Sequence, residues 1–253
     1  MAKSSGLGSN LYVGQYDLSG SIGALGTVET TRASLDVPAI NQSAMDRIVA
    51  LKDGSVGFTS YWTGATAGEG HAVLSVLPRT DVIVTYAQDA LVGGAAASIN
   101  AKQIGYATSR GQDGSLVAET MCHANGYGLE WSGGGTGDGM LTTGLQTFAT
   151  GTVSGTSIDL GSLSTLFGAA AYLHCTVMPS GTLTVTVEDS ANDIAFATVT
   201  AMVFTPLTGP GSERVQGAVG ATVRRYVRVT CSGVHGTASV AVNFIRYLTS
   251  SAA

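Results

Sequence analysis

The residues that could carry chemistry are few, and they are spread thinly along the chain. The four histidines are His71, His123, His174 and His235. A zinc site needs His or Cys at short fixed spacings, and no two histidines here lie within four residues of each other. The nearest pairs, Cys122-His123 and His174-Cys175, are sequence neighbours whose side chains point to opposite faces of a strand. The pattern favours histidines at polar or interface positions of strands over metal ligands.

An acidic cluster follows a predicted strand at Glu188, Asp189 and Asp193. Its carboxylates could hold calcium, but a solvated turn is the interpretation that we favour. Paired carboxylates could also hydrolyse glycosides. The two tryptophans that would line such a cleft, Trp62 and Trp131, lie elsewhere in the sequence. The sequence therefore predicts no enzyme, no catalytic residue, no metal and no cofactor.

Two further motifs have structural interpretations. The glycine-rich segment 131–139 lacks the Gly-Lys-Ser/Thr ending of a phosphate-binding loop. An arginine cluster could bind an anion, but arginines on a strand more often pair with carboxylates of their own sheet. Its members are Arg224, Arg225 and Arg228, and the candidate carboxylates are Glu213, Glu188 and Asp189.

Composition points to assembly. The chain has 253 residues, 44% of them hydrophobic and only 11% charged, with 35 glycines and a net charge of −5. Low charge is typical of the cores of subunit interfaces, and there is no basic stripe for nucleic acid. The three cysteines, Cys122, Cys175 and Cys231, have the spacing of buried thiols. The sequence shows neither a leader nor a membrane span, so we expect synthesis in the cytoplasm and no membrane partner.

The elements that must position these residues are mostly strands. Strand signals cover residues 11–20, 27–36, 55–63 and 81–87. A capping-box variant at Ser43 and Asp46, with an apolar stripe that follows it, predicts a helix that ends at Gly54. A second short helix is expected over 71–77. Residues 97–124 form the best hairpin, because Asp113-Gly114 lies between two alternating runs.

The predicted fold class is mainly β. Residues 1–131 form an N-terminal β-barrel or sandwich domain with one or two short helices, and 132–140 form a glycine-rich linker. Residues 141–253 show short strands with regular turn signals, which is typical of a β-sandwich.

Several stretches resemble the major tail tube proteins of long non-contractile-tailed bacteriophages, especially those that infect actinobacteria. They are NLYVGQYDLSG (10–20), NQSAMDRIVALKDGSVGFTSYW (41–62), AKQIGYATSRGQDGSLVAETMCHANGYGLEW (101–131), VEDSANDIAFATVT (187–200), GSERVQGAVGATVRRYVRV (211–229) and VAVNFIRY (240–247). The similarity extends over nearly the whole chain, and its motifs are structural and not catalytic.

The resemblance implies a virion structural protein that assembles with copies of itself. Six subunits would form a ring, although a three-fold ring of doubled domains stays open, and stacked rings would form a tail tube. Double-stranded DNA would pass through the lumen without specific binding during genome ejection. Tape measure, tail terminator and distal tail proteins are the further partners that it implies. The net charge of −4 in residues 1–132 fits a lumen that repels phosphate, but the sequence does not say which acids face inward.

The expected contacts between subunits or rings lie in two loops. They are Asp36, Asn41 and Gln42 in the first, and Arg110, Gln112, Asp113 and Ser115 in the hairpin turn. Two other functions stay open: a capsid-decoration or fibre-type β-sandwich protein, and a carbohydrate-binding module. The last would need exposed aromatic rings. The candidates in the second part are Tyr172, Phe196, Tyr226, Phe244 and Tyr247, mostly at positions that alternate like a core.

Overall fold

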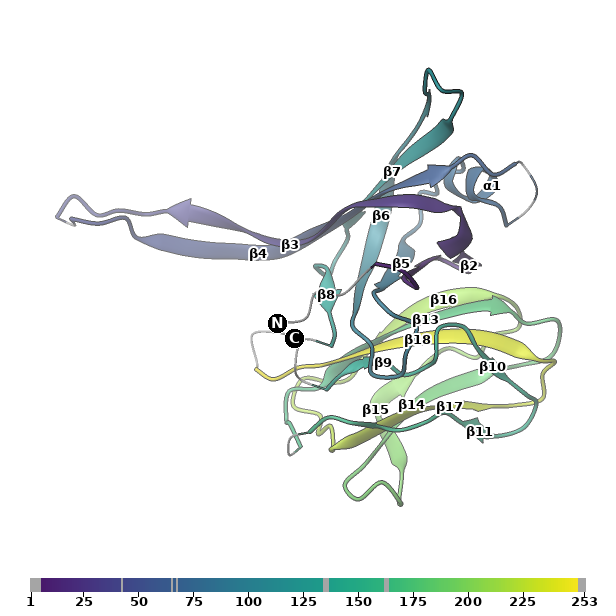
Figure 1. Ribbon diagram of the computed structural model, residues 1–253. Helices are drawn as coiled ribbons and strands as arrows, with labels where there is room; N and C mark the ends of the chain where they lie inside the picture. The colour runs from purple at the N-terminus through teal and green to yellow at the C-terminus, as the bar shows by residue number, and fades with distance from the viewer. Residues whose placement is uncertain are drawn as a thin grey trace. The chain divides into compact units, whose positions relative to one another are not determined.

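The computed structural model describes residues 6–41, 43–64, 66, 68–133, 137–161 and 164–249, which form a mainly β protein (Figure 1). The predicted fold class is thereby confirmed. By their contacts, the described residues divide into two compact units. Unit 1 comprises those of 1–20, 82–98 and 131–253, and unit 2 those of 21–81 and 99–130. Unit 1 therefore contains two segments that precede residue 131 in the chain.

Most strands of unit 1 form two antiparallel sheets. The first has the order β10-β18-β13-β16, with β9 beside β18, and the second has the order β11-β17-β14-β15, with β12 beside β17. Their bounds are β9 (Gly139–Met140), β10 (Gln146–Phe148), β11 (Val153–Ser154), β12 (Ile158–Asp159), β13 (Ala169–Val177), β14 (Thr184–Ser190), β15 (Ala197–Val203), β16 (Gly211–Gln216), β17 (Tyr226–Ser232) and β18 (Ala238–Arg246).

Alternating side chains explain why these sheets pack face to face. In β14, Val185 and Val187 are buried while Thr184 and Thr186 are half-buried on the other face. One hydrophobic cluster takes buried side chains from both sheets, among them Leu173 and Phe244 from the first. A sheet with one apolar face must cover that face, and a second such sheet does so. The predicted sandwich in the second part of the chain is confirmed.

Three short strands from the first part of the chain also belong to unit 1. β1 (Asn10–Val13) pairs with β2 (Tyr16–Asp17) and with β5 (Val82–Ala87). Two small apolar clusters hold these strands against the first sheet of the sandwich. The clusters are Tyr12, Ala87, Ala96, Met140 and Ala241, and Ile83, Ala170, Tyr172, Ile245 and Tyr247. The short 3-10 turn η1 (Ser19–Ser21) and β8 (Glu130–Trp131) lie where the chain passes between the units.

Ser132, Asp138 and Gly139 of the glycine-rich segment contact β18. Ser132 and Asp138 are buried; the Ser132 hydroxyl donates to Asn243 Oδ1 over 2.6 Å, and Asp138 Oδ2 accepts from the Arg246 amide over 3.0 Å. A Cβ on Gly139 would lie 2.6 Å from a backbone oxygen, so only glycine allows this close approach. Residues 134–136 of the expected linker lie outside the described residues.

Unit 2 is built on an antiparallel sheet in the order β6-β7-β4-β3. Its elements are β3 (Ile22–Asp36), β4 (Arg47–Tyr61), α1 (Gly70–Leu74), β7 (Leu116–Ala124) and most of β6 (Ala96–Arg110). The predicted hairpin is confirmed, since β6 pairs with β7 from Ala101↔Ala124 to Arg110↔Leu116. Beyond the sheet, β3 and β4 continue together as a long two-stranded arm (Figure 1).

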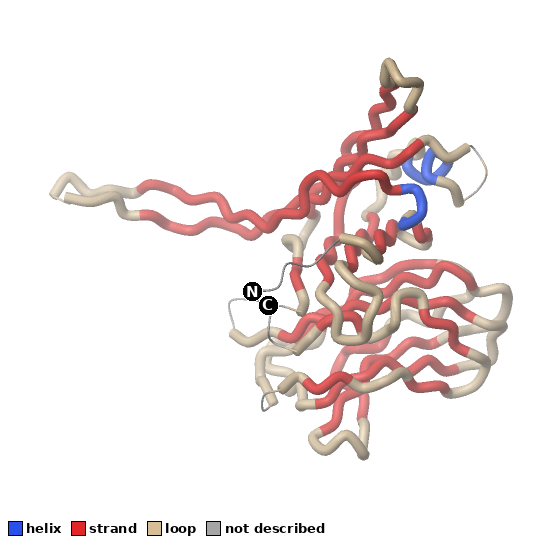
Figure 2. The backbone as a smooth tube through the Cα atoms, viewed as in Figure 1, coloured by secondary structure: helices blue, strands red, loops and turns tan. Residues whose placement is uncertain are grey.

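The helix expected from Ser43 to Gly54 is wrong, because residues from Arg47 onward form β4. Figure 2 shows this segment as strand, with helical structure at α1. An isolated helix of about ten residues gains little stability in water, whereas pairing with β3 satisfies the backbone groups along β4. The β-branched Ile48 and Val49 also suit a strand. The second expected helix is confirmed at α1, with a shorter extent.

Candidate assembly interface

The turn between β6 and β7 carries four of the predicted contact residues, all of them described. Asp113 Oδ1 accepts hydrogen bonds from the Ser115 hydroxyl over 2.7 Å and from the Ser115 amide over 3.0 Å. These two bonds favour the carboxylate and lower the pKa of Asp113. Gly114 has a φ of 89°, which explains glycine at this position. Arg110 and Gln112 are exposed, so the turn presents charged and polar groups on a fixed backbone.

The other predicted contact residues lie at the tip of the arm. Asp36 ends β3 and pairs with Arg47 at the start of β4, with Nε and Oδ1 2.9 Å apart. Both side chains are more than half exposed, so water screens the pair and it adds little stability. Asn41 is exposed in the connecting loop, and Gln42 lies outside the described residues.

The structure does not bring these two groups of residues together. β7 pairs with the far end of β4, where Tyr61 lies opposite Val117. Arg47, beside the arm tip, is fourteen residues away along β4, which corresponds to about 45 Å of extended strand. Unit 2 therefore presents two separate candidate contacts at opposite ends of one strand (Figure 1).

The arm has two open edges. Pairing between β4 and β7 covers Ser55 to Tyr61 only. From Arg47 to Gly54, β4 pairs with β3 alone among the described residues, and β3 pairs with β4 alone. A two-stranded ribbon is marginally stable by itself in water, and an open edge is a template for another strand.

One face of the arm is apolar and exposed. Leu35 lies opposite Ile48 in the register, and their side chains are 58% and 56% exposed. Val37, directly after the end of β3, continues the alternation and is 41% exposed. Exposed apolar side chains that follow one another along a surface mark sites of protein contact.

The opposite face of the arm is largely polar. Asp36 lies opposite Arg47, and Ser34 lies opposite Val49, so all four side chains share this face. Val49 is 60% exposed and is the apolar member of the set. The arm is therefore an amphipathic ribbon whose apolar side faces water in the single chain.

Sequence reasoning missed this ribbon because it assigned Ile48 and Val49 to a helix. A usable signal was present in the first strand, where Leu35 and Val37 flank Asp36 in strict alternation. After Asp46 the signal is weaker, because Ile48, Val49, Ala50 and Leu51 form a continuous apolar run without alternation.

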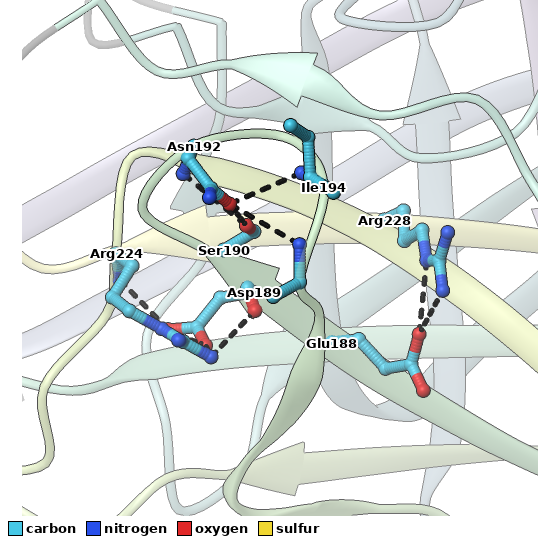
Figure 3. A network of polar contacts seen from close by, with 8 residues as sticks. Glu188, Asp189, Ser190, Asn192, Ile194, Arg224 and Arg228 are labelled. Carbon is cyan, nitrogen blue, oxygen red and sulfur yellow. Dashed lines mark hydrogen bonds and ion pairs between the residues drawn. The ribbon is translucent and has the colours of Figure 1, made fainter.

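The arginine cluster of the sandwich forms ion pairs within its own sheet (Figure 3). Arg224 Nε lies 2.7 Å from Asp189 Oδ1, and Arg228 Nε lies 2.9 Å from Glu188 Oε2. Arg225 pairs with Asp159, which the sequence did not identify, and this partner lowers the pKa of Asp159 to about 2.

The acids that were considered for calcium are used in the same way. Glu188 and Asp189 accept from the arginines, and Asp193 accepts from the Ser157 hydroxyl over 2.6 Å. Within the described ranges, no group of three or more His, Cys, Asp or Glu side chains could hold a metal ion.

The aromatic residues of the second part form no open stacking surface. Tyr172, Phe244 and Tyr247 are buried. The guanidinium carbon of Arg228 lies 3.9 Å from the ring centre of Phe196, and that of Arg225 lies 5.1 Å from the ring centre of Tyr226. Each of these rings already has a partner, which does not favour a sugar-binding face.

The three cysteines are buried free thiols, and burial raises the pKa of each one, to about 12 for Cys122 and Cys231 and to about 11 for Cys175. The part of the chain that the structure describes contains no helix that is long and apolar enough to span a membrane.

Comparison with known proteins gives little further information. No family model matches the chain, and no curated protein matches it. The Dit protein of phage SPP1, a hub protein of the adsorption apparatus of phages that infect Gram-positive bacteria, is 9% identical, with a TM-score of 0.32 over 94% of this chain and 99% of its own. Two structures of the phage p2 baseplate in its activated conformation, one with strontium and one with calcium, are 7% identical, with TM-scores of 0.35 over 94% of this chain and 98% of theirs. Likeness at this level carries no conclusion about fold or function.

Proposed function

We propose that this chain is a structural subunit of a bacteriophage tail, which assembles with copies of itself into rings that stack as a tail tube. The amphipathic β3–β4 arm is the observation that carries the proposal. Among the described residues, its apolar face is exposed, and neither edge of the arm pairs with a further strand between Arg47 and Gly54. Covering them with a second copy removes apolar surface from water and pairs the open backbone groups.

The position of the arm supports assembly into a closed ring. The arm leaves unit 2 beyond one end of the sheet. In the proposed ring it meets a different part of the chain on a second copy. Contacts between unlike surfaces are heterologous, and they close into a ring or continue as a filament. In the ring, the arm tip with Asp36, Asn41 and Gln42 contacts one neighbour, while the turn with Arg110 and Ser115 contacts another subunit or the next ring.

The charge of the chain supports a conduit for DNA. Residues 1–131 form the tube part and 141–253 the outer part, as the resemblance implies. The first part is acidic, and an acidic lumen repels phosphate so that double-stranded DNA moves through without binding. The protein is then a virion component without catalytic activity. Its partners in the tail are further copies of itself, together with tape measure, tail terminator and distal tail proteins.

Electron microscopy of the purified full chain tests this proposal. We expect rings or tubes with a lumen that admits a DNA duplex, and averaged end views give the symmetry, for which we expect six. A chain that stays monomeric at high concentration contradicts self-assembly. Closed rings that never stack, alone or in mixtures with tail proteins, contradict the tube.

A pair of neighbouring substitutions tests the arm itself. Ile48→Ser removes an apolar side chain from the exposed apolar face, and we expect it to abolish assembly. Val49→Ser is the matched control, since Val49 has almost the same exposure but lies on the polar face. Assembly by the Ile48→Ser chain at the wild-type concentration contradicts the role of the apolar face.

A further inference from the structure

A chain of buried polar side chains crosses unit 1 between its short strands and the sandwich. Its members are His174, Thr85, Ser98, Asn243 and Ser132, none of them more than 2% exposed. The side chain of His174, on β13 of the sandwich, reaches two partners. Its Nδ1 lies 2.7 Å from the carbonyl oxygen of Gly14, in the turn between β1 and β2. Its Nε2 lies 2.8 Å from Thr85 Oγ1 on β5.

The donor and the acceptor of every hydrogen bond in this network of side chains follow from the groups at the two ends of the network. The Gly14 carbonyl can only accept, so His174 Nδ1 carries the proton and donates. In a neutral ring Nε2 then accepts, so the Thr85 hydroxyl must donate to it. The Thr85 oxygen therefore accepts from the Ser98 hydroxyl over 2.8 Å.

The other half of the chain continues in the same direction. Ser98 Oγ accepts from Asn243 Nδ2 over 2.9 Å, and Asn243 Oδ1 accepts from the Ser132 hydroxyl over 2.6 Å. The Nδ1 proton of His174 and the hydroxyl protons of Thr85, Ser98 and Ser132 thus each have an acceptor when His174 is neutral. The Ser132 hydroxyl also lies 3.2 Å from the carbonyl oxygen of Ala96.

A second proton on His174 breaks this arrangement. Nε2 becomes a donor and meets the Thr85 hydroxyl, which must turn toward Ser98. The oxygen of Ser98 then accepts from both Thr85 and Asn243, and its own proton has no acceptor in the chain. A buried hydroxyl without a partner and a buried charge each disfavour the folded arrangement.

The groups that face His174 do little to stabilise its charged form. Tyr12 of β1 lies with its ring centre 5.5 Å from the imidazole, and burial raises its pKa to about 12, so it is neutral. Asp17 of β2 attracts a charged imidazole and opposes the effect of burial. On the neighbouring strands the paired residues are uncharged: Ala241 on β18 and Ser212 on β16. Burial dominates and lowers the pKa of His174 to about 4.

The contacts that hold β1 and β5 on the sandwich are few compared with those within it. Among the described residues, two small clusters with five buried side chains each join them to the first sheet. The core between the sandwich sheets is one large cluster, to whose described members neither strand contributes. Free energies of local opening follow such differences in buried contacts.

We propose that His174 is an acid-sensitive latch, and that its protonation releases β1, β2 and β5 from the sandwich while the sandwich itself stays folded. The latch is independent of the proposed function, since it acts within unit 1 of a single chain. It stabilises the closed arrangement fully above the ordinary histidine pKa of about 6.5, and the stabilisation is lost as pH falls from there toward 4.

Hydrogen exchange of the full chain between pH 7 and pH 4, corrected for the intrinsic rate at each pH, tests the latch. We expect the opening constant of amides in β1 and β5 to rise about 100-fold over this range. Amides in β14 and β17 should keep their protection. Unchanged protection of β1 and β5, or an equal rise in β14 and β17, overturns the proposal.

Two substitutions separate the latch from a merely structural role. His174→Gln keeps one donor and one acceptor but cannot become charged, so the rise with acid should disappear. His235→Gln is the control, because His235 is also buried, at 6% exposure, but lies outside the network; it should keep the rise. If His174→Gln retains the rise, the proposal is wrong. Should that variant not fold, NMR titration of the wild-type ring decides, since a ring that titrates near 6.5 in the folded protein also contradicts it.

Discussion

The sandwich of unit 1 and the arm of unit 2 contain similar apolar residues, but these residues are buried in the sandwich and exposed on the arm. In the sandwich, alternating valines and leucines face a second sheet and are fully buried. In the arm, Leu35 and Ile48 lie opposite each other on one face of the ribbon, and both are more than half exposed. The two sandwich sheets therefore cover each other within the chain, whereas no other part of the described chain buries this face of the arm. The same pattern of apolar side chains can therefore stabilise a fold, when a second sheet of the chain buries it, or leave a surface that is open for contact with another molecule.

Ion pairs repeat this contrast. Asp189 and Arg224 in the sandwich are 5% and 31% exposed, and the carboxylate also accepts from the Arg224 amide over 2.7 Å. Asp36 and Arg47 on the arm are 51% and 61% exposed. The first pair stabilises the fold, whereas the second is screened by water and adds little stability.

A cavity in the sandwich should cause the largest loss in the free energy of unfolding. Phe244→Ala removes a fully buried ring from the main cluster, and we expect a loss of about 4 kcal/mol in the free energy of unfolding. Denaturant unfolding measures it. Val234→Ala, at a side chain that is 84% exposed, is the control and should change stability by less than about 0.5 kcal/mol. Similar losses in both variants would refute the contrast between core and surface.

Acid should have the next largest effect, through His174. Its folded pKa of about 4 lies below the unfolded value of about 6.5. The unfolded chain therefore binds more protons between these values, and stability falls as pH falls. We expect wild type to lose about 3 kcal/mol more than His174→Gln between pH 7 and pH 4. Equal losses in parallel urea titrations would show that another group is responsible.

Breaking the sandwich ion pair should cost less. Asp189→Ala removes the carboxylate that accepts from Arg224 Nε and from the Arg224 amide, while Nη2 still donates to the backbone carbonyl of residue 189 (Figure 3). We expect a loss of about 2 kcal/mol, below that of a fully buried pair because water reaches Arg224. On the arm, Asp36→Ala should change the free energy of unfolding by less than about 0.5 kcal/mol. A larger loss for Asp36→Ala would contradict the exposed position of the arm.

Substitutions on the apolar face of the arm should have the smallest effect on stability. Leu35→Ser should change the free energy of unfolding of the dissociated chain by less than about 0.5 kcal/mol, because Leu35 is already 58% exposed. The same change should prevent assembly in sedimentation experiments at the wild-type concentration. A destabilised monomer would mean that the arm packs on its own chain.

The sequence predicts local features of this protein well where the signal is short. The Asp113-Gly114 turn places the β6–β7 hairpin correctly, because the backbone there admits few residues. Alternation in β14 likewise predicts one buried face. The helix from Ser43 was wrong because three-residue spacing over one turn does not distinguish a helix from a strand. The segment is a strand because it pairs with β3 from Arg47 onward.

Local sequence patterns did not predict the long-range contacts. Asp159, the partner of Arg225, is 66 residues away in the sequence. His174 bonds to Gly14 and Thr85, at separations of 160 and 89 residues. No local pattern marks either pair, since each residue type is ordinary in its own strand. The polar candidate contact residues could be named from their loops, and their role stays a prediction, while the apolar face of the arm and the histidine network required the fold.

The division of unit 1 into separate stretches of chain has a consequence for folding on the ribosome. β1 finds its partner β5 only after some seventy further residues have been made, since Asn10 lies opposite Ala87. Both strands then wait for β13, which carries His174, before their inner faces are covered. Residues 21–130 leave the ribosome before the sandwich exists, so the open edges of the arm are exposed on a nascent chain. Slow, non-local pairing of this kind favours aggregation, and lower temperature or a bound chaperone during synthesis should raise the soluble yield.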